Sequence, residues 1–171
     1  MGAGSRLLDV IIAVFLFVHI PITILLDAQA VFPRSWFHPT LIGAHRHYLL
    51  TYRDPLMTPP YAPWFLSLVW TEMVLQLPFF FAGAYAFIAR KNWIRIPAVA
   101  YSSFVLATMC PILAELWQHR GPGYARYTVL SFYAPWALFP LLIFCRTAFK
   151  QPFPAPAPAD PWGHMHKHKW I

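Results

Sequence analysis

Long apolar runs separated by short polar segments dominate the pattern of this chain. Four of these runs, at about residues 7–26, 64–88, 93–116 and 127–149, are close to the roughly 20 residues that a helix needs to cross a bilayer. Each run is interrupted by very few charged side chains. The pattern therefore predicts four transmembrane helices joined by short loops, with one longer loop at residues 31–63.

Prolines occur in every one of the four runs, at Pro21, Pro78, Pro97, Pro111, Pro135 and Pro140. Pro78 cannot donate to the helical hydrogen-bond ladder, so the Val74 carbonyl loses its usual partner and the span is expected to bend there. Bent helices do not pack flush against one another, and freed carbonyls are tolerated only where they are buried or wet. The sequence thus predicts an all-α membrane protein, a four-transmembrane-helix bundle whose kinked helices enclose a ligand cavity.

Composition supports a membrane protein. Of the 171 residues, 58% are hydrophobic and 11% are charged, and the mean hydropathy is +0.48; soluble domains have about 25% charged residues. The net charge of +7 would suggest a nucleic-acid partner in a soluble protein. Here the basic residues lie at the ends of the runs, as topology signals do, so no nucleic-acid partner is expected.

The first run has a second interpretation as a signal peptide, because Ala28-Gln29-Ala30 has the small-x-small form of a cleavage site. The apolar stretch is longer than the 7–15 residues of a typical signal core, which favours an uncleaved helix. An even number of spans places both termini on one side. Eight Lys and Arg residues lie on that side and five on the other, so both termini are predicted to be cytosolic.

Two regions are expected. Residues 1–150 form the four-span transmembrane domain, and residues 151–171 form a cytosolic tail rich in Pro and His. Lys167 and Lys169 lie close to the carboxyl end in the pattern of a dilysine retrieval signal, which predicts the endoplasmic reticulum membrane. Alternating histidines of the tail could hold a metal, but a solvated cationic segment is favoured.

Two acids carry the functional prediction. Glu72 lies in the middle of the second run, where an ionisable group is costly and usually faces a protein interior or an aqueous cavity. Gln76 shares its helical face. Asp27, at the end of the first run, is the expected partner, with a hydrogen bond shared between the two carboxyl groups. Such a pair in an apolar cavity would bind an amphiphile that carries a cationic or polar group; a purely structural pair that fixes helix register is the alternative.

The long loop adds a further acid and several aromatic residues. Asp54 precedes Pro55, and it is either a turn-forming residue or a residue at the mouth of the cavity. The aromatic side chains of residues 31–63 suit the membrane interface and suggest a lid. The histidines of this loop have no standard metal spacing, and no phosphate-binding glycine loop occurs, so neither a metal nor a cofactor is expected.

Motifs along nearly all of residues 1–150 resemble those of the sigma-2 receptor family in the EXPERA superfamily. They include His19-Ile20-Pro21-Ile22-Thr23, Asp54-Pro55-Leu56, Pro63-Trp64-Phe65, Gln76-Leu77-Pro78-Phe79-Phe80, Pro111-Ile112-Leu113 and Tyr133-Ala134-Pro135. The resemblance implies a four-helix endoplasmic reticulum protein that binds sterols and cationic amphiphiles.

Matched position by position, the resemblance also implies roles for single residues. Asp27 is expected to pair with a ligand amine, Glu72 to stand beside it, and Asp54 to be a second acid important for binding. Gln76, Thr108 and Tyr133 fall at positions that line the pocket. The family further suggests a homodimer and a sterol transporter of the Niemann–Pick type C kind as a partner.

Three functions are open at this point. The leading hypothesis is a sterol and amphiphile binding protein with a role in sterol homeostasis or trafficking. The alternative is a sterol double-bond isomerase of the Δ8-Δ7 type, in which two carboxyl groups with separated pKa values act as acid and base. The sequence favours the binding protein over the enzyme. In a third hypothesis, the acids only order the helices of a scaffold.

Overall fold

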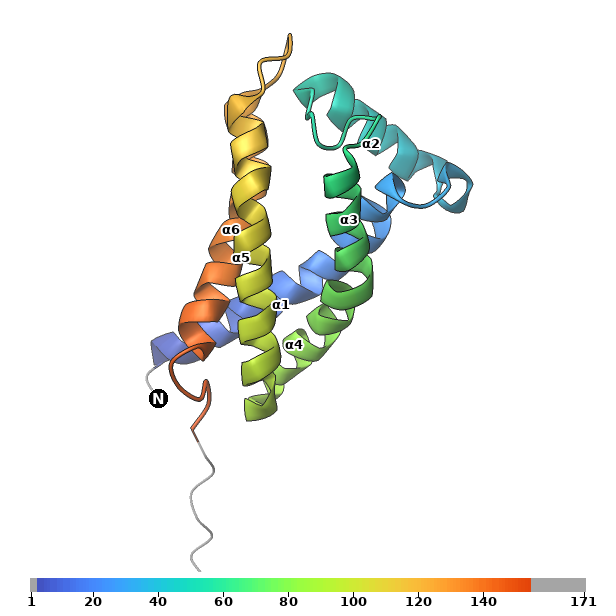
Figure 1. Ribbon diagram of the computed structural model, residues 1–171. Helices are drawn as coiled ribbons and strands as arrows, with labels where there is room; N and C mark the ends of the chain where they lie inside the picture. The colour runs from blue at the N-terminus through green and yellow to red at the C-terminus, as the bar shows by residue number, and fades with distance from the viewer. Residues whose placement is uncertain (1–2, 155–171) are drawn as a thin grey trace, which may run out of the picture.

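A computed structural model describes residues 3–154, which are helices joined by loops (Figure 1). Four segments are long and apolar enough to cross a membrane, namely Gly4–Ala30, Pro63–Ala89, Asn92–Gln118 and Arg126–Thr147. No strand occurs within the described residues. The predicted all-α architecture with four membrane-spanning helices is therefore confirmed, and the predicted ends of the spans lie within a few residues of the observed ones.

The second span is one continuous helix with an irregular centre. α3 (Pro63–Thr71) passes into a π-helical turn, η3 (Glu72–Gln76), and then into α4 (Leu77–Ala89). The Leu77 N–H donates to the carbonyl of Glu72, five residues earlier. Pro78, next in the chain, has no N–H to donate. The predicted bend is thus achieved by a wide turn just before the proline, and Figure 1 shows α3 and α4 meeting at an angle.

The four spans pack mainly as two pairs. α1 (Ala3–Leu25) runs along α4, and α5 (Arg95–Gln118), entered through the short 3-10 turn η4 (Asn92–Ile94), runs along α6 (Arg126–Thr147). A side chain at Gly83 of α4 would place its Cβ 2.8 Å from Leu16 Cδ1. A small residue at this position lets the two backbones approach closely, as is common in membrane helix pairs.

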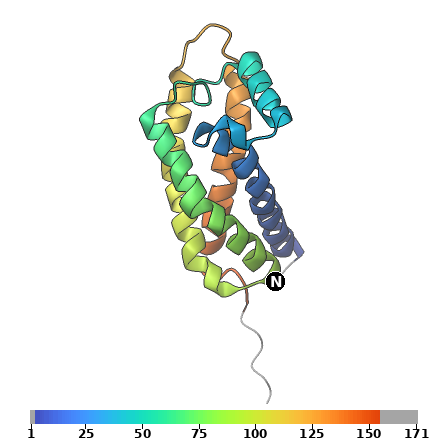
Figure 2. The same cartoon turned by 90° about the vertical axis from the view of Figure 1, so that its right-hand side faces the viewer.

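The long loop contains a helix that the sequence did not predict. η1 (Asp27–Ala30) and η2 (Arg34–Trp36) are short 3-10 turns, and α2 (Pro39–Tyr52) follows them. His38 caps α2 by accepting a hydrogen bond from the Thr40 N–H at 3.3 Å, and Arg53 ends it in the left-handed conformation with φ 54°. α2 lies at the end of the bundle opposite to the beginning of the chain (Figure 2). It occupies the position expected of a lid.

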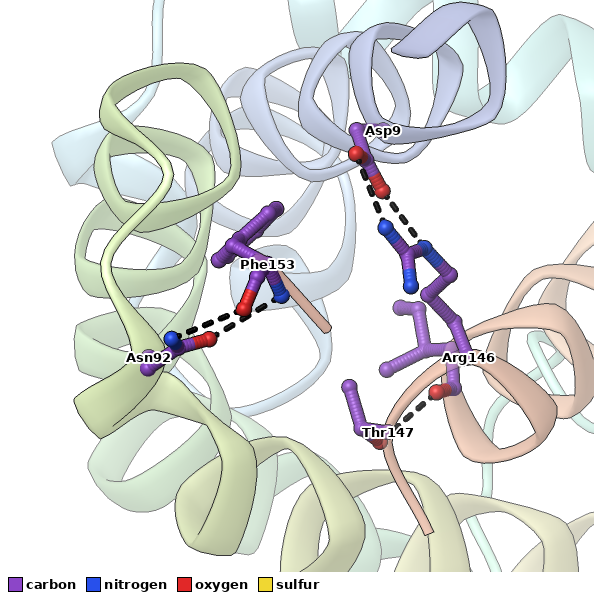
Figure 3. Close-up of polar contacts among 6 residues, drawn as sticks. Asp9, Asn92, Arg146, Thr147 and Phe153 are labelled. Atoms are coloured by element: carbon purple, nitrogen blue, oxygen red, sulfur yellow. Dashed lines mark hydrogen bonds and ion pairs between the residues drawn. The ribbon is translucent and has the colours of Figure 1, made fainter. Parts of the chain in front are cut away.

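A polar clasp closes the other end of the bundle. Arg146 of α6 binds Asp9 of α1 through two hydrogen bonds of 2.7 and 3.1 Å (Figure 3). Asn92 pairs with both backbone groups of Phe153, at 2.9 and 3.0 Å. Arg95 donates to the carbonyl of Thr147, the last residue of α6, and to that of Ala148, which follows it. The first residues of the predicted tail therefore pack against the helices, while Lys167 and Lys169 lie outside the described residues.

Candidate functional site

A cavity of about 370 Å³ lies between the lid helix α2 and the spans. Its wall combines residues of the first three spans, of α2 and of α6, and most of the wall is apolar. The apolar wall consists of Leu26, Ala44, Met57, Phe65, Leu68, Val69, Val105, Met109, Ile112, Phe132 and Trp136. The polar wall consists of His19, Asp27, His45, Tyr48, Glu72, Gln76, Tyr101, Thr108 and Tyr133. This partly open cavity is the candidate for the ligand site that the kinked helices were predicted to form.

Asp27 stands where the first span changes its conformation. α1 ends at Leu25, and Asp27 is the first residue of the 3-10 turn η1, so its side chain leaves the helix near the lid. The Oδ2 atom is buried and has no hydrogen-bond partner among the described residues. A carboxylate oxygen left in this state has lost its hydration without compensation. Asp27 therefore offers the cavity a hydrogen-bonding oxygen that the fold does not use.

Glu72 is held by α1 in a different way from that predicted. Its Oε1 accepts a 2.7 Å hydrogen bond from the Thr23 hydroxyl and lies 3.4 Å from His19 Nε2. No hydrogen bond between Glu72 and Asp27 occurs among the described residues, although the two carboxyl groups line the same cavity and repel each other electrostatically. The hydrogen bond expected with Asp27 is thus replaced by one with Thr23. Glu72 contacts α1 at Thr23 and His19, which precede Asp27 by four and eight residues, or about one and two helical turns.

The π-helical turn also positions Gln76. Both Glu72 and Gln76 belong to η3, and both line the cavity, as their shared face predicted. Single π turns in α-helices occur frequently at functional sites, because they widen the helix and redirect its side chains. In this chain, the turn directs two polar side chains of an apolar span to the same enclosed space.

Asp54 has a structural position under the lid and is not part of the cavity wall. Its side chain is fully buried and accepts hydrogen bonds from the backbone N–H groups of Leu56 and Met57, at 2.9 and 3.3 Å. These contacts are those of a turn-forming aspartate, one of the two interpretations of the sequence. Its Oδ2 also accepts from the hydroxyls of Tyr48 at 2.7 Å and Tyr133 at 3.1 Å.

Asp54 therefore connects α2 to α6. Burial and the adjacent Asp54 carboxylate raise the pKa of Tyr48, which keeps its phenol a hydrogen-bond donor at all physiological pH values. Tyr48 and Tyr133 line the cavity, so Asp54 acts on a ligand only through the two rings that it orients.

The remaining predicted residues are also placed. Thr108 lines the cavity, but its hydroxyl donates to the Val105 carbonyl at 3.0 Å, so it contributes mainly its methyl group and an acceptor oxygen. No group of three His, Cys, Asp or Glu side chains arranged to hold a metal occurs in residues 3–154.

Four polar residues of the cavity wall were not predicted as site residues from the sequence: His19, His45, Tyr48 and Tyr101. A signal for His19 was present, because His19, Thr23 and Asp27 recur at intervals of four and so share one face of a helix. His45 and Tyr48 could not be assigned to the site without α2. Tyr101 lies beside Ser102 and Ser103 in an apolar run, a pattern that does not distinguish a site residue from an ordinary packing tyrosine.

Comparison with known proteins agrees with the architecture. The family model described as EXPERA (EXPanded EBP superfamily) matches residues 40–147. The chain is 39% identical to Sigma intracellular receptor 2 of Xenopus tropicalis over 159 residues, which cover 87% of this chain and 92% of that protein. It is 36% identical to Sigma intracellular receptor 2 of Homo sapiens over 158 residues, covering 84% and 89%.

A more distant relative is Efficient mitochondria targeting-associated protein 19 of Schizosaccharomyces pombe, which is 29% identical over 134 residues, covering 76% of this chain and 64% of that protein. The described structure, with four helices suited to cross a membrane, is consistent with these relationships. The chain is a multi-pass membrane protein that belongs to the EXPERA (EXPanded EBP) superfamily.

Proposed function

We propose that this protein is a sigma-2-receptor-like membrane protein that binds sterols and cationic amphiphilic ligands in the intramembrane cavity and acts in sterol homeostasis or trafficking. The observation that carries the proposal is the unpartnered, buried Oδ2 of Asp27 in an otherwise apolar cavity. A ligand ammonium group would restore the interaction that the carboxylate lost on burial. Hydrogen bonds to charged groups contribute about 1.5–3 kcal/mol.

The size and lining of the cavity support an amphiphilic ligand. Ligand cavities have volumes of roughly 300–1,000 Å³ and are mostly apolar, with a few placed polar groups. The cavity of about 370 Å³ is within this range. Its rings and aliphatic side chains suit a rigid hydrocarbon skeleton such as that of a sterol.

The test is to measure ligand binding to the purified protein in lipid nanodiscs. A labelled cationic amphiphile and a photo-crosslinking sterol would be applied to wild type, Asp27→Asn and Glu72→Gln. The matched control is Glu115→Gln, because Glu115 is an exposed acid of α5 that does not line the cavity. We expect Asp27→Asn to weaken amine binding by about thirtyfold, the equivalent of about 2 kcal/mol, and to retain sterol crosslinking.

Unchanged amine binding in Asp27→Asn would overturn the role of this acid. Sterol crosslinking that is insensitive to a competing amphiphile would show that the two ligands do not share one cavity. Binding of both ligands that survives the loss of both acids would favour the scaffold hypothesis.

A second candidate function, sterol double-bond isomerisation, is favoured by one observation. His19 Nε2 lies 3.4 Å from Glu72 Oε1, and both residues line the cavity. In such a reaction, an acid protonates one carbon of the alkene, which leaves a carbocation at the other alkene carbon, and a base removes a proton from the next carbon beyond it; the double bond moves by one position and no oxidant is needed. The same nanodisc samples, incubated with a Δ8 sterol and analysed by mass spectrometry, are expected to show no product. Turnover that is lost in Glu72→Gln would make the protein an isomerase.

We also propose that the protein resides in the endoplasmic reticulum with both termini in the cytosol. The support is the bias of Lys and Arg toward the side of the termini and the positions of Lys167 and Lys169. The variant Lys167→Ser/Lys169→Ser should leave the endoplasmic reticulum, as judged by microscopy of a fluorescently labelled chain. Retention of this variant would remove the support that the two lysines give.

The family resemblance further supports a homodimer and an association with a sterol transporter of the Niemann–Pick type C kind. Crosslinking in native membranes, with differently tagged copies of the chain and with the transporter, tests both. Crosslinks that are no stronger than those to an unrelated four-span protein would contradict them.

A further inference from the structure

The inner end of the cavity contains a histidine whose hydrogen-bonding capacity is unused. The His19 side chain is 5% exposed, and within residues 3–154 neither of its ring nitrogens has a hydrogen-bond partner. The Glu72 Oε1 atom, which accepts a hydrogen bond from Thr23, lies 3.4 Å from His19 Nε2 but without the geometry of a hydrogen bond to it. Three aromatic rings fix the orientation of the imidazole. It stacks on Phe80 at 4.3 Å and contacts Trp136 at 4.7 Å and Phe15 at 5.3 Å between ring centroids.

Tyr101 presents a second unused group beside the first. It is 7% exposed, its hydroxyl has no partner among the described residues, and its ring stacks on Phe79 at 4.3 Å. Tyr101 also contacts Phe80, the ring on which His19 stacks. Both residues line the cavity, and both interact electrostatically with Glu72.

Unpartnered buried polar atoms are concentrated in this one place. Within residues 3–154, such atoms belong to His19, Asp27, His45, Tyr101 and Arg126, and all except that of Arg126 are on residues that line the cavity. More than nine in ten buried polar groups of proteins find a partner, so a local concentration of exceptions requires an explanation. A ligand that brings its own polar groups into the cavity is a sufficient one.

The chemistry of the two inner residues specifies the group that they would bind. A neutral imidazole has one donor and one acceptor nitrogen, and a phenol can both donate and accept. An alcohol hydroxyl complements this pair, because it can donate to an imidazole nitrogen while it accepts from the Tyr101 phenol. A second cationic group would not fit, since it cannot accept a hydrogen bond.

We propose that His19 and Tyr101 form a hydroxyl-binding subsite at the inner end of the cavity, so that the protein prefers amphiphiles with a hydroxyl group remote from their cationic or polar end. The inference rests on the proposed function and specifies its ligand class. His19 and Asp27 are eight residues apart along the first span, or roughly 12 Å at 1.5 Å per residue. The ligand hydroxyl and the group that meets Asp27 are separated by a similar distance.

The test compares two rigid, sterol-like amines that differ only in the replacement of this hydroxyl by hydrogen. Their affinities are measured by competition in nanodiscs for wild type, Tyr101→Phe, His19→Gln and His19→Phe. The control Tyr85→Phe removes the hydroxyl of an α4 tyrosine that is 58% exposed and does not line the cavity. Thermal stability in the same nanodiscs identifies any variant that fails to fold, and Tyr101→Phe, which removes a single oxygen, keeps the proposal testable.

We expect wild type and Tyr85→Phe to bind the hydroxylated amine roughly tenfold more tightly than the deoxy amine. Tyr101→Phe and the His19 variants should lose most of this preference and retain their affinity for the deoxy amine. The inference is overturned if wild type binds both amines equally through Asp27, which would mean that only water occupies the subsite; the proposed function would then stand. It is also overturned if the preference persists in the Tyr101 and His19 variants. If wild type binds neither amine, the proposed function fails as well.

Discussion

The acids of this chain have different surroundings, and these surroundings assign them different tasks. Asp27 has an unused oxygen in the cavity wall, Glu72 is engaged by Thr23, and Asp54 is buried among four hydrogen-bond donors outside the wall. Of the three, only Asp27 has a buried oxygen without a hydrogen-bond partner within residues 3–154, and this oxygen is free to bind a ligand. A loss of binding after substitution therefore means something different at each acid.

Asp54→Ala is expected to impair folding and binding together. The change leaves two phenols and two backbone N–H groups without their acceptor, and buried unsatisfied groups cost roughly 1–3 kcal/mol each, so we expect a loss of about 4 kcal/mol or more in the free energy of unfolding. Thermal unfolding in detergent measures this effect. Amine and sterol binding should weaken to the same extent, in contrast to Asp27→Asn. A stable Asp54→Ala protein that loses only amine binding would contradict the positioning role.

At the scale of the elements, the second span is the one whose geometry depends most on a single residue. Pro78→Ala supplies an N–H and removes a ring that clashes with the preceding turn, so the helix is expected to straighten and the cavity to contract. Binding of a bulky amphiphile should weaken by roughly tenfold, about 1.4 kcal/mol, and that of a small one should change little. The control is Pro97→Ala, because Pro97 lies in the first turn of α5, where no N–H donor is required. Equal effects of the two changes would show that the bend does not shape the cavity.

The lid helix α2 introduces a dependence on pH. Burial lowers the pKa of His45 from its ordinary value, the nearby Arg34 lowers it further, and Asp54 opposes the shift. His45 is therefore neutral at pH 7, and its Nδ1 interacts with Gln29 Oε1 at 3.3 Å. Since the unfolded chain binds this proton more readily, the stability that neutral His45 provides decreases as the pH falls below its unfolded pKa of about 6.5.

Protonated His45 would also place a positive charge in the wall that contains Asp27. We expect the affinity for a quaternary ammonium amphiphile, whose own charge does not change with pH, to fall severalfold between pH 7 and pH 5. The decrease should be smaller in His45→Gln. Titrations of both proteins in the same nanodiscs make the comparison, and superimposable pH profiles would exclude a contribution of His45.

The elements differ in how well the sequence predicts them. The four spans were found because a bilayer imposes a minimum length of apolar sequence, which is visible without tertiary information. α2 was missed because its histidines and arginine suggest a solvated loop, although Pro39 after the capping His38 and the spacing of Leu41, Ala44, Tyr48 and Tyr52 were signals of a helix. The π-helical turn was also missed, since Pro78 predicts a bend but not how the backbone makes it.

The candidate site could be predicted only in part, because the sequence shows which residues lie on the spans but not how each span is rotated. Asp27, Glu72, Gln76, Thr108 and Tyr133 do line one cavity, but the partner of Glu72 depends on the exact rotation of the second span. The π-helical turn, in which an N–H bonds to the carbonyl five residues earlier, rotates the side chains of the second span relative to an α-helix. Residue spacing based on a regular α-helix does not predict this rotation.

At the scale of the whole molecule, the clasp at the end opposite the lid joins the first and last spans. Asp9 and Arg146 are both buried, with side-chain exposures of 4% and 10%, and removal of one member of a buried ion pair typically costs 3–5 kcal/mol. Asp9→Asn should therefore lower the unfolding midpoint strongly, while the folded fraction still binds ligand, because neither residue lines the cavity. The double variant Asp9→Leu/Arg146→Met should recover much of the stability.

Unfolding curves and ligand-binding titrations of wild type, Asp9→Asn and Asp9→Leu/Arg146→Met test whether the clasp affects stability without affecting ligand binding. A single variant as stable as wild type would show that the clasp contributes nothing. A stable variant without ligand binding would show that the two ends of the bundle are coupled.

The unpartnered atoms around the cavity have a consequence for the lifetime of the protein in a cell. A ligand that binds only the folded chain adds free energy to folding, about 2.7 kcal/mol at a concentration one hundred times its Kd. Cellular quality control degrades marginally stable proteins, and differences of 1–2 kcal/mol change abundance severalfold. Depletion of membrane sterol should therefore shorten the half-life of this protein, and sterol supply should lengthen it, so that its abundance becomes a gauge of the lipid that it holds.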